Sequence, residues 1–261
     1  MTDTLNTPVP FGVTSNDPFA SIGITTNWGI VFEMISHDHP ESQTPVVADD
    51  ANGEYVTESA KPIDGRINHS ATYKAQENDT DAGGTISVGA GTAVAIDSMT
   101  ITCNKGDFAQ VQVSGHEHVG GSRSVHNNTA RNVPYPTFPA FGATNFGYDL
   151  GVPEAAIQSA TWQMSAGHTD DQNKDGNFLC GTTHGIQLTM TFTAIDPTAW
   201  SLTALVADDW IWTEKGAPES STTHQTKTLT VIKYIGGPTA SASTSGTSGG
   251  SGSGESSGTG T

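Results

Sequence analysis

The chain has 261 residues, of which 27 are Asp or Glu and 10 are Lys or Arg, so its formal net charge is −17. A surface of this charge repels phosphate groups, which argues against binding to nucleic acid or to an anionic membrane. No apolar run reaches the roughly 18 residues of a membrane-spanning helix. The segment from Met1 to Pro10 lacks the basic and apolar regions of a signal peptide, which predicts synthesis in a cytoplasm.

Strands are predicted wherever apolar and polar residues alternate, because successive side chains of a strand point to opposite faces. The clearest example covers residues 186–194, with apolar residues at the even positions and Gln or Thr between them. Residues 99–113 contain two such segments around a turn at 104–107, which predicts a β-hairpin. Further strands are expected at 28–37, 67–75, 160–166 and 226–235, which are rich in Thr, Val, Ile and aromatic residues.

Two short helices are also predicted. Asp196 and Pro197 supply an N-cap and a first-turn residue for a helix that runs to Ala207, and Pro153 opens a second that runs to Ser159.

These elements divide the chain into four parts. We expect an N-terminal arm at 1–20, a first β unit with long loops at 21–150, a second β unit at 151–236 and a tail at 237–261. The tail is almost entirely Gly, Ser, Thr and Ala. It cannot bury enough apolar surface to offset its ordering entropy, so it is predicted to be disordered and flexible.

The two β units show the same order of sequence features. Trp28 precedes a turn at Gly53, Trp162 precedes a turn at Gly176, and an alternating strand follows each turn. The fold class is therefore mostly β, arranged either as two tandem antiparallel units or as a single β-sandwich or barrel-like domain.

Two His-x-His pairs are the first candidate for chemistry. His37 with His39, and His116 with His118, would each place two imidazoles on one side of an extended chain, as metal-binding β proteins do. Neither pair has a third ligand at a telling spacing, and solvated strand ends are the alternative. A metal-dependent enzyme that uses these four histidines is a third hypothesis, and we expect no metal site and no cofactor.

The segment from Asp171 to Gly176 matches the start of a calcium loop, with oxygen-bearing side chains at its first, third and fifth positions. Thr182 stands at the twelfth position, where such a loop needs a bidentate carboxylate. A hairpin turn rich in Asp and Asn is the alternative, and the residues alone leave ion binding there open.

The remaining candidates point away from an enzyme. Cys103 and Cys180 lie far apart in apolar stretches, which predicts buried free thiols. Trp210 and Trp212 suit either a sugar-stacking platform or the edge of a core. No nucleophile, phosphate-binding or dinucleotide motif stands in its proper context, so we predict no catalytic residues.

Three segments resemble major tail proteins, the tail-tube subunits of bacteriophages and prophages. They are residues 50–54 (DANGE), 71–75 (ATYKA) and 101–116 (ITCNKGDFAQVQVSGH). In that family a β-sandwich or barrel-like fold with a flanking helix assembles into rings, usually hexameric, which stack into a conduit for DNA. The resemblance implies a virion structural protein that forms a homo-oligomer with other tail proteins nearby and meets DNA only as a passenger in the lumen.

The resemblance also assigns roles to the long loops predicted at 40–64 and 120–148, which would supply contacts between subunits. The second loop holds several prolines and aromatic residues, so we expect it to dock on a neighbour or on the other β unit. The acidic charge would line the lumen and keep DNA from adhering. The alternative function is a virion-surface or extracellular adhesin, or a carbohydrate-binding β-sandwich.

Overall fold

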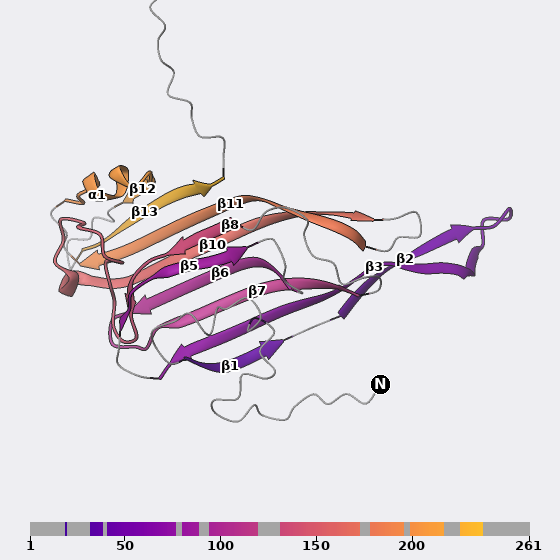
Figure 1. Cartoon of the computed structure of the whole chain (residues 1–261), viewed down its shortest axis with the longest axis horizontal. Coiled ribbons are helices and arrows are strands. Elements are labelled where there is room, and N and C mark those ends of the chain that lie inside the picture. Colours follow the sequence, from indigo (N-terminus) through magenta and orange to yellow (C-terminus); the bar gives the residue numbers. More distant parts are fainter. Residues whose placement is uncertain are drawn as a thin grey trace, which may run out of the picture.

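The computed structural model of the chain describes Phe19 and residues 32–38, 41–76, 80–88, 94–119, 131–172, 178–195, 199–216 and 225–236. Nine of the described strands form one large antiparallel sheet: β1 (Phe32–Asp38), β2 (Glu41–Asp49), β3 (Tyr55–Ala75), β6 (Ala95–Asn104), β7 (Gln110–Val119), β10 (Ile157–Gln172), β11 (Phe178–Ile195), β12 (Ile211–Gly216) and β13 (Thr226–Ile235). Their order is β1-β3-β7-β6-β10-β11-β13-β12, and β2 also pairs with β3 (Figure 1).

The register of the sheet places one continuous apolar row across eight strands. Neighbours in this row lie directly opposite one another and run in the order Met34, Tyr73, Val111, Ile101, Trp162, Met190, Val231, Trp212. The six inner members of the row are at most 1% exposed. Burial of side chains of this size contributes about 1.5–3 kcal/mol each, so this face is the main source of stability.

The opposite face of the sheet carries mainly uncharged polar residues. Thr72, Gln112, Thr100, Gln163 and Thr189 form the row next to the apolar one, because successive residues of a strand alternate between faces. Thr102, Thr161, Thr191 and Thr230 form a second such row. The alternation read from the sequence therefore corresponds to one apolar face and one face of hydroxyl and amide groups.

Two small sheets cover the apolar face. β4 (Thr80–Asp81) pairs with β9 (Phe138–Pro139), and β5 (Gly84–Val88) pairs with β8 (Arg131–Tyr135). Their buried side chains belong to the same hydrophobic core as those of the large sheet. Phe146 contacts Phe192 on β11, with ring centroids 5.6 Å apart. The prediction of a loop at 120–148 is wrong where β8 and β9 form, but the described part of this segment docks on the second β unit, as expected.

The two halves of the large sheet have the same topology. In the first half the strands lie in the order β1-β3-β7-β6, and in the second half in the order β10-β11-β13-β12. With β2 left aside, the strands follow the chain order β1, β3, β6, β7 in the first half and β10, β11, β12, β13 in the second. In each half the first strand pairs with the second, the second pairs with the fourth, and the fourth pairs with the third. The similar order of features in the sequence therefore corresponds to two four-strand units that share one sheet and one core, joined where β6 pairs with β10.

The predicted strands at 67–75, 160–166, 186–194 and 226–235 and the hairpin at 99–113 are confirmed. The strand at 28–37 is confirmed from Phe32 onward, since residues 28–31 lie outside the described part. The arm at 1–20, apart from Phe19, and the tail at 237–261 lie outside it as well.

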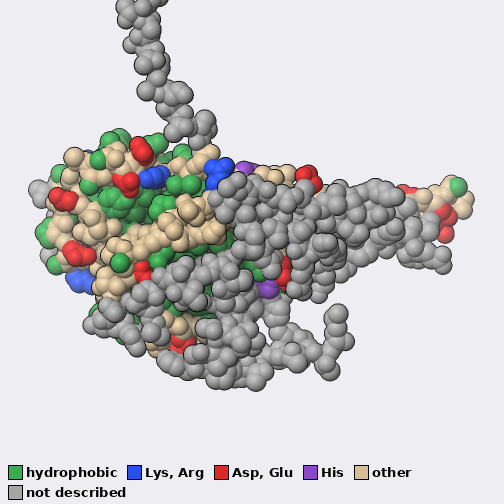
Figure 2. Space-filling model, in the orientation of Figure 1, with side chains coloured by type: hydrophobic (Ala, Val, Ile, Leu, Met, Phe, Trp, Pro, Cys, Tyr) green, Lys and Arg blue, Asp and Glu red, His purple; other side chains and the backbone are tan. Residues whose placement is uncertain are grey.

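The loop expected at 40–64 is wrong, because β2 and β3 form a long hairpin there that extends away from the body of the molecule (Figure 1). At its tip, Asp50 Oδ1 accepts hydrogen bonds from the backbone N–H groups of Asn52 (2.8 Å) and Glu54 (2.9 Å). Gly53 has a φ of +81°, which suits glycine. The tip is acidic and exposed, and Figure 2 shows red side chains there.

Both helix predictions were too long. After Pro153 the structure has only a 3-10 turn, η3 (Glu154–Ala156), which ends where Ile157 begins β10 opposite Ala194. The helix predicted to run to Ala207, α1, covers only Thr203–Ala207. The preceding residues do not join it, because Trp200 is buried in the core and the backbone N–H of Ser201 donates to the carbonyl of Leu150. Neither of these described helices has the length and apolar content that a membrane crossing needs.

Candidate functional site

Histidines and carboxylates from three strands meet at the end of the sheet from which the β2–β3 hairpin projects. His116 and His118 lie on β7, Asp97 on β6, and His168 and Asp170 on β10. We call these five residues the His/Asp cluster. The three histidine side chains are between 1% and 7% exposed. The extended backbone of β7 places its two imidazoles on one side, with ring centroids 5.3 Å apart, which confirms the expected arrangement of this pair.

Irregularities in the sheet bring the other members to the cluster. The β6–β7 register shifts between Ile96 and Ser98, and the β10–β11 register shifts between Ser165 and Gly167. Each shift changes which face the following side chains point to, and such bulges often re-aim a side chain at a functional site. The second shift precedes His168, whose ring lies 5.1 Å from that of His116.

Asp97 holds the first histidine in place. Its Oδ1 atom lies 2.8 Å from Nδ1 of His116 and 3.2 Å from Nε2 of His168. Burial works against ionisation of Asp97, but the hydrogen bond with His116 and the favourable electrostatic interactions with His116, His168 and Arg66 hold its pKa below the ordinary value. The carboxylate therefore remains charged beside the two imidazoles.

His168 has both ring nitrogens engaged. Nε2 lies 2.9 Å from the carbonyl oxygen of Ile96, so it carries the proton and donates, and Nδ1 accepts from the hydroxyl of Thr183 at 3.1 Å. Burial lowers the pKa of His168, although the carbonyl of Ile96 and the charge of Asp97 act in the opposite direction. This ring is thus kept neutral and fixed in orientation.

The two carboxylate oxygens of Asp170 have different surroundings. Its Oδ2 atom accepts from Arg66 at 2.9 Å and lies 3.2 Å from Nε2 of His118. Its Oδ1 atom is buried and has no hydrogen-bond partner within the part of the chain that the structure describes. A buried carboxylate oxygen without a donor costs free energy, so Oδ1 suits a further positive group.

The cluster offers two sets of three ligand atoms. Asp97, His116 and His168 form one set, and His116, His118 and Asp170 form the other, with all atoms of a set within 4.8 Å of one another. Imidazole nitrogens combined with carboxylate oxygens are donors that bind transition metals.

The other candidate metal ligands lie partly outside the described residues. The backbone of His37 lies in β1, and His39 lies outside the described residues. Asp171 lies at the end of β10, but residues 173–177 of the calcium-like segment are not described, so ion binding there stays untested. The sequence indicated His116 and His118 but missed Asp97, His168 and Asp170. No spacing could have revealed them, because strand pairing brings them together from distant positions.

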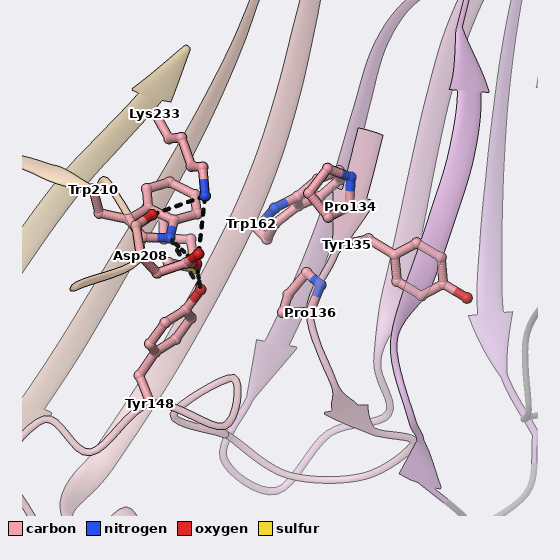
Figure 3. Close-up of a pocket in the computed structure, with 9 residues that line it drawn as sticks. Pro134, Tyr135, Pro136, Tyr148, Trp162, Asp208, Trp210 and Lys233 are labelled. Carbon is pink, nitrogen blue, oxygen red and sulfur yellow. Dashed lines mark hydrogen bonds and ion pairs between the residues drawn. The ribbon is translucent and has the colours of Figure 1, made fainter. Parts of the chain in front are cut away.

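A second polar group surrounds a small cavity of about 130 Å³ beside α1. Figure 3 shows Tyr148, Asp208, Trp210 and Lys233 pointing toward one another, with Tyr135 turned away. Tyr148 Oη donates to Asp208 Oδ2 at 2.6 Å, and Trp210 Nε1 donates to Tyr148 Oη at 3.0 Å. Lys233 Nζ donates to Asp208 at its carbonyl oxygen (2.8 Å) and at Oδ1 (3.1 Å).

These contacts satisfy the carboxylate of Asp208 from several sides. Burial opposes its ionisation, but hydrogen bonds from Tyr148 and Lys233 hold the pKa of Asp208 below the ordinary value. Burial and the hydrogen bond to Asp208 raise the pKa of Tyr148. A neutral tyrosine bound to a charged, saturated carboxylate is a structural link between the loop after β9 and the turn after α1.

Buried side chains account for most of the remaining candidates. Trp162, Trp200 and Trp210 are buried, whereas Trp212 is 53% exposed, so the described tryptophans do not form a platform of exposed rings. Cys103 is a buried free thiol, as predicted. The backbone of Cys180 lies in β11, and its side chain is outside the described part.

Comparison of the sequence with protein-family models finds no matching family, and no curated protein matches it either.

Proposed function

We propose that this chain is a structural subunit that assembles edge to edge with copies of itself, as a tail-tube protein of a bacteriophage virion. The repeated topology supports the proposal. Each half of the sheet is one four-strand unit. The sheet ends at β1 on one side and at β12 on the other, and no described strand pairs with the outer edge of either. Unpaired strand edges are templates for pairing with another chain.

The junction inside the chain indicates how one unit joins the next. There β6 pairs with β10, which places Ile101 opposite Trp162 and Thr100 opposite Gln163. A second copy placed beside β12 would continue the sheet in the same way. In that contact β12 would take the place of β6, and β1 of the second copy would take the place of β10.

The apolar row identifies the residues that would meet. In each half it has four members, so Trp212 at its end holds the place of Ile101, and Met34 at its start holds the place of Trp162. On the other face, Ile211 holds the place of Thr100, and Ile35, in the bulge beside Met34, lies near the place of Gln163.

The exposed side chains of the two edges match this arrangement. Ile35 on β1 is 52% exposed, and Ile211 and Trp212 on β12 are 56% and 53% exposed. Edge strands usually carry charges or prolines that prevent pairing, and Glu33 on β1 and Lys215 on β12 are such charges, but they stand beside the exposed apolar residues. Apolar residues on both edges, at positions that face each other in the continued row, are the observation that carries the proposal.

Chains joined head to tail in this way form a closed ring when the rotation from each chain to the next brings the last chain back to the first. Rings of a tail tube would enclose a channel for DNA. With the hydroxyl and amide face turned inward, that channel would be uncharged rather than acidic, and Thr100, Thr161 and Gln163 would offer no cationic contacts to phosphates. The β2–β3 hairpin, which extends beyond the body, would reach the next ring.

The number of chains in such a ring follows from the number of units. The resemblance implies six chains, and three chains of two units each would present six four-strand units. Symmetry analysis of particle images counts the chains.

Negative-stain electron microscopy of the purified full chain tests assembly, and rings or tubes are the expected result. Ile35→Lys and Ile211→Glu alone should each give dispersed particles, whereas the double variant should restore assembly, because the two new charges attract across the same contact. Val206→Lys is the control, since Val206 is 59% exposed but lies on α1 rather than on an edge strand.

Dispersed wild-type particles, or single variants that assemble as well as the wild type, would refute edge-to-edge assembly by this register. A dispersed wild type whose tryptophan fluorescence changes with added sugars would support the carbohydrate-binding alternative instead.

A further inference from the structure

We propose that the His/Asp cluster is a binding site for one divalent transition-metal ion of the zinc class, with His116, His118 and Asp170 as ligands and Asp97 as the residue that orients His116. This inference is independent of the assembly proposal. Ligand atoms of the three residues lie within 4.8 Å of one another, and the side chains of His116 and His118 are 1% and 7% exposed.

The hydrogen bond between Asp97 and His116 defines which nitrogen can bind a metal. Nδ1 of His116 lies 2.8 Å from Asp97 Oδ1. Nε2 is therefore the nitrogen that can bind an ion without breaking this contact. Metal-binding histidines commonly donate their other N–H to a carboxylate, which fixes the ring and increases its basicity.

Asp170 provides the anionic ligand. Arg66 holds its Oδ2 atom at 2.9 Å, and Oδ1 is buried with no hydrogen-bond partner among the described residues. A metal ion would give this oxygen the positive partner that it lacks. The guanidinium of Arg66 would then fix the carboxylate from the side, as a hydrogen-bonded neighbour of a ligand.

The alternative set, Asp97, His116 and His168, is less suited to an ion. Nε2 of His168 already donates to the carbonyl of Ile96, and Nδ1 accepts from Thr183. Both contacts fix the ring, and coordination through Nε2 would require the loss of the first. In the other set, His116 can coordinate through Nε2 and keep its hydrogen bond to Asp97, and Asp170 can coordinate through Oδ1 and keep its hydrogen bond to Arg66.

The chemistry of the donors selects the class of ion. Two imidazoles and one carboxylate suit zinc and its neighbours in the transition series, whereas calcium and magnesium prefer ligand sets made of oxygens. Three protein ligands leave the fourth tetrahedral position for water. Because the ligands come from β7 and β10, and Arg66 comes from β3, the ion would join the base of the β2–β3 hairpin to the second half of the sheet.

The test uses the full chain purified without a histidine tag and dialysed against a chelator. Addition of Co²⁺ should produce the visible absorption of a tetrahedral cobalt site, saturating at one ion per chain, and Zn²⁺ should displace it. Zn²⁺ should also raise the melting temperature, because a ligand that binds the folded state stabilises it.

His118→Gln and Asp170→Asn should each abolish the cobalt spectrum. Asp97→Asn should keep the spectrum but weaken binding about 10- to 100-fold, as expected for a residue that acts through a ligand. His184→Ala is the control, since this exposed histidine of β11 is outside the cluster, and it should bind as the wild type does.

Circular dichroism establishes whether each variant is folded. If His118→Gln does not fold, His118→Ala replaces it. Absence of the cobalt spectrum in the wild type, or an unchanged spectrum in both ligand variants, would overturn the proposal.

Discussion

Tyr148 and Asp208 are joined by a hydrogen bond of 2.6 Å between Oη and Oδ2. The two residues lie in segments that are distant in the sequence, one after β9 and one after α1. Trp210 and Lys233 contact the same pair, and Lys233 Nζ also lies 5.9 Å from the centroid of the Trp210 ring. The turn after α1 is therefore fastened both to β13 and to the loop that covers the core.

Tyr148→Phe should lower the free energy of unfolding by about 1–2 kcal/mol, because it removes a hydrogen bond to a charged group. Urea denaturation measures the change. Tyr234→Phe, at a residue that is 57% exposed, is the matched control and should have little effect. Equal stability of the two variants would show that the link to Asp208 contributes nothing.

Asp208→Asn should make stability less dependent on acid pH. The folded-state pKa of Asp208 lies below its ordinary value of 3.8 because hydrogen bonds from Tyr148 and Lys233 outweigh the effect of burial. Its ionised form therefore stabilises the fold above pH 3.8, and this contribution is lost as the pH falls through the folded-state pKa.

The difference in unfolding free energy between the wild type and Asp208→Asn should accordingly be constant near neutral pH and shrink below pH 3.8. Thermal or urea unfolding at a series of pH values measures it. A difference that stays the same down to the acid transition would contradict the proposed role of the charge.

Cys103 should be unreactive in the folded protein. It is fully buried, and burial raises its pKa to about 12, so almost no thiolate forms at neutral pH. Iodoacetamide labelling followed by peptide mass spectrometry should leave Cys103 unmodified in buffer and label it in concentrated urea. Rapid labelling without denaturant would show that β6 opens to solvent.

Much of the sheet could be predicted from the sequence because its strands alternate strictly. From Ile186 to Ala194 each apolar residue faces the core and each Thr or Gln faces away, and the register of β11 confirms this. Periodicity fails where tertiary contacts decide. Trp200 enters the core and interrupts the predicted helix, and Ile157 begins a strand where Pro153 had indicated a helix.

The candidate metal site could be predicted only in part. The His-x-His spacing of His116 and His118 indicated two ligands on one side of a strand. Asp170 is brought beside them only because β6 lies between β7 and β10 and the register of β10 shifts after Ser165. Bulges leave little trace in a single sequence, so the third ligand could not be predicted.

The pairing of β6 with β10 within one chain has a kinetic consequence. Every second junction in a closed row would be intramolecular, so it forms during folding at a high effective concentration and does not dissociate on dilution. In the proposed ring, only the contacts between β12 of one chain and β1 of the next would depend on protein concentration. In the proposed ring, a chain of two units would therefore form half as many junctions between molecules as a chain that carries a single unit.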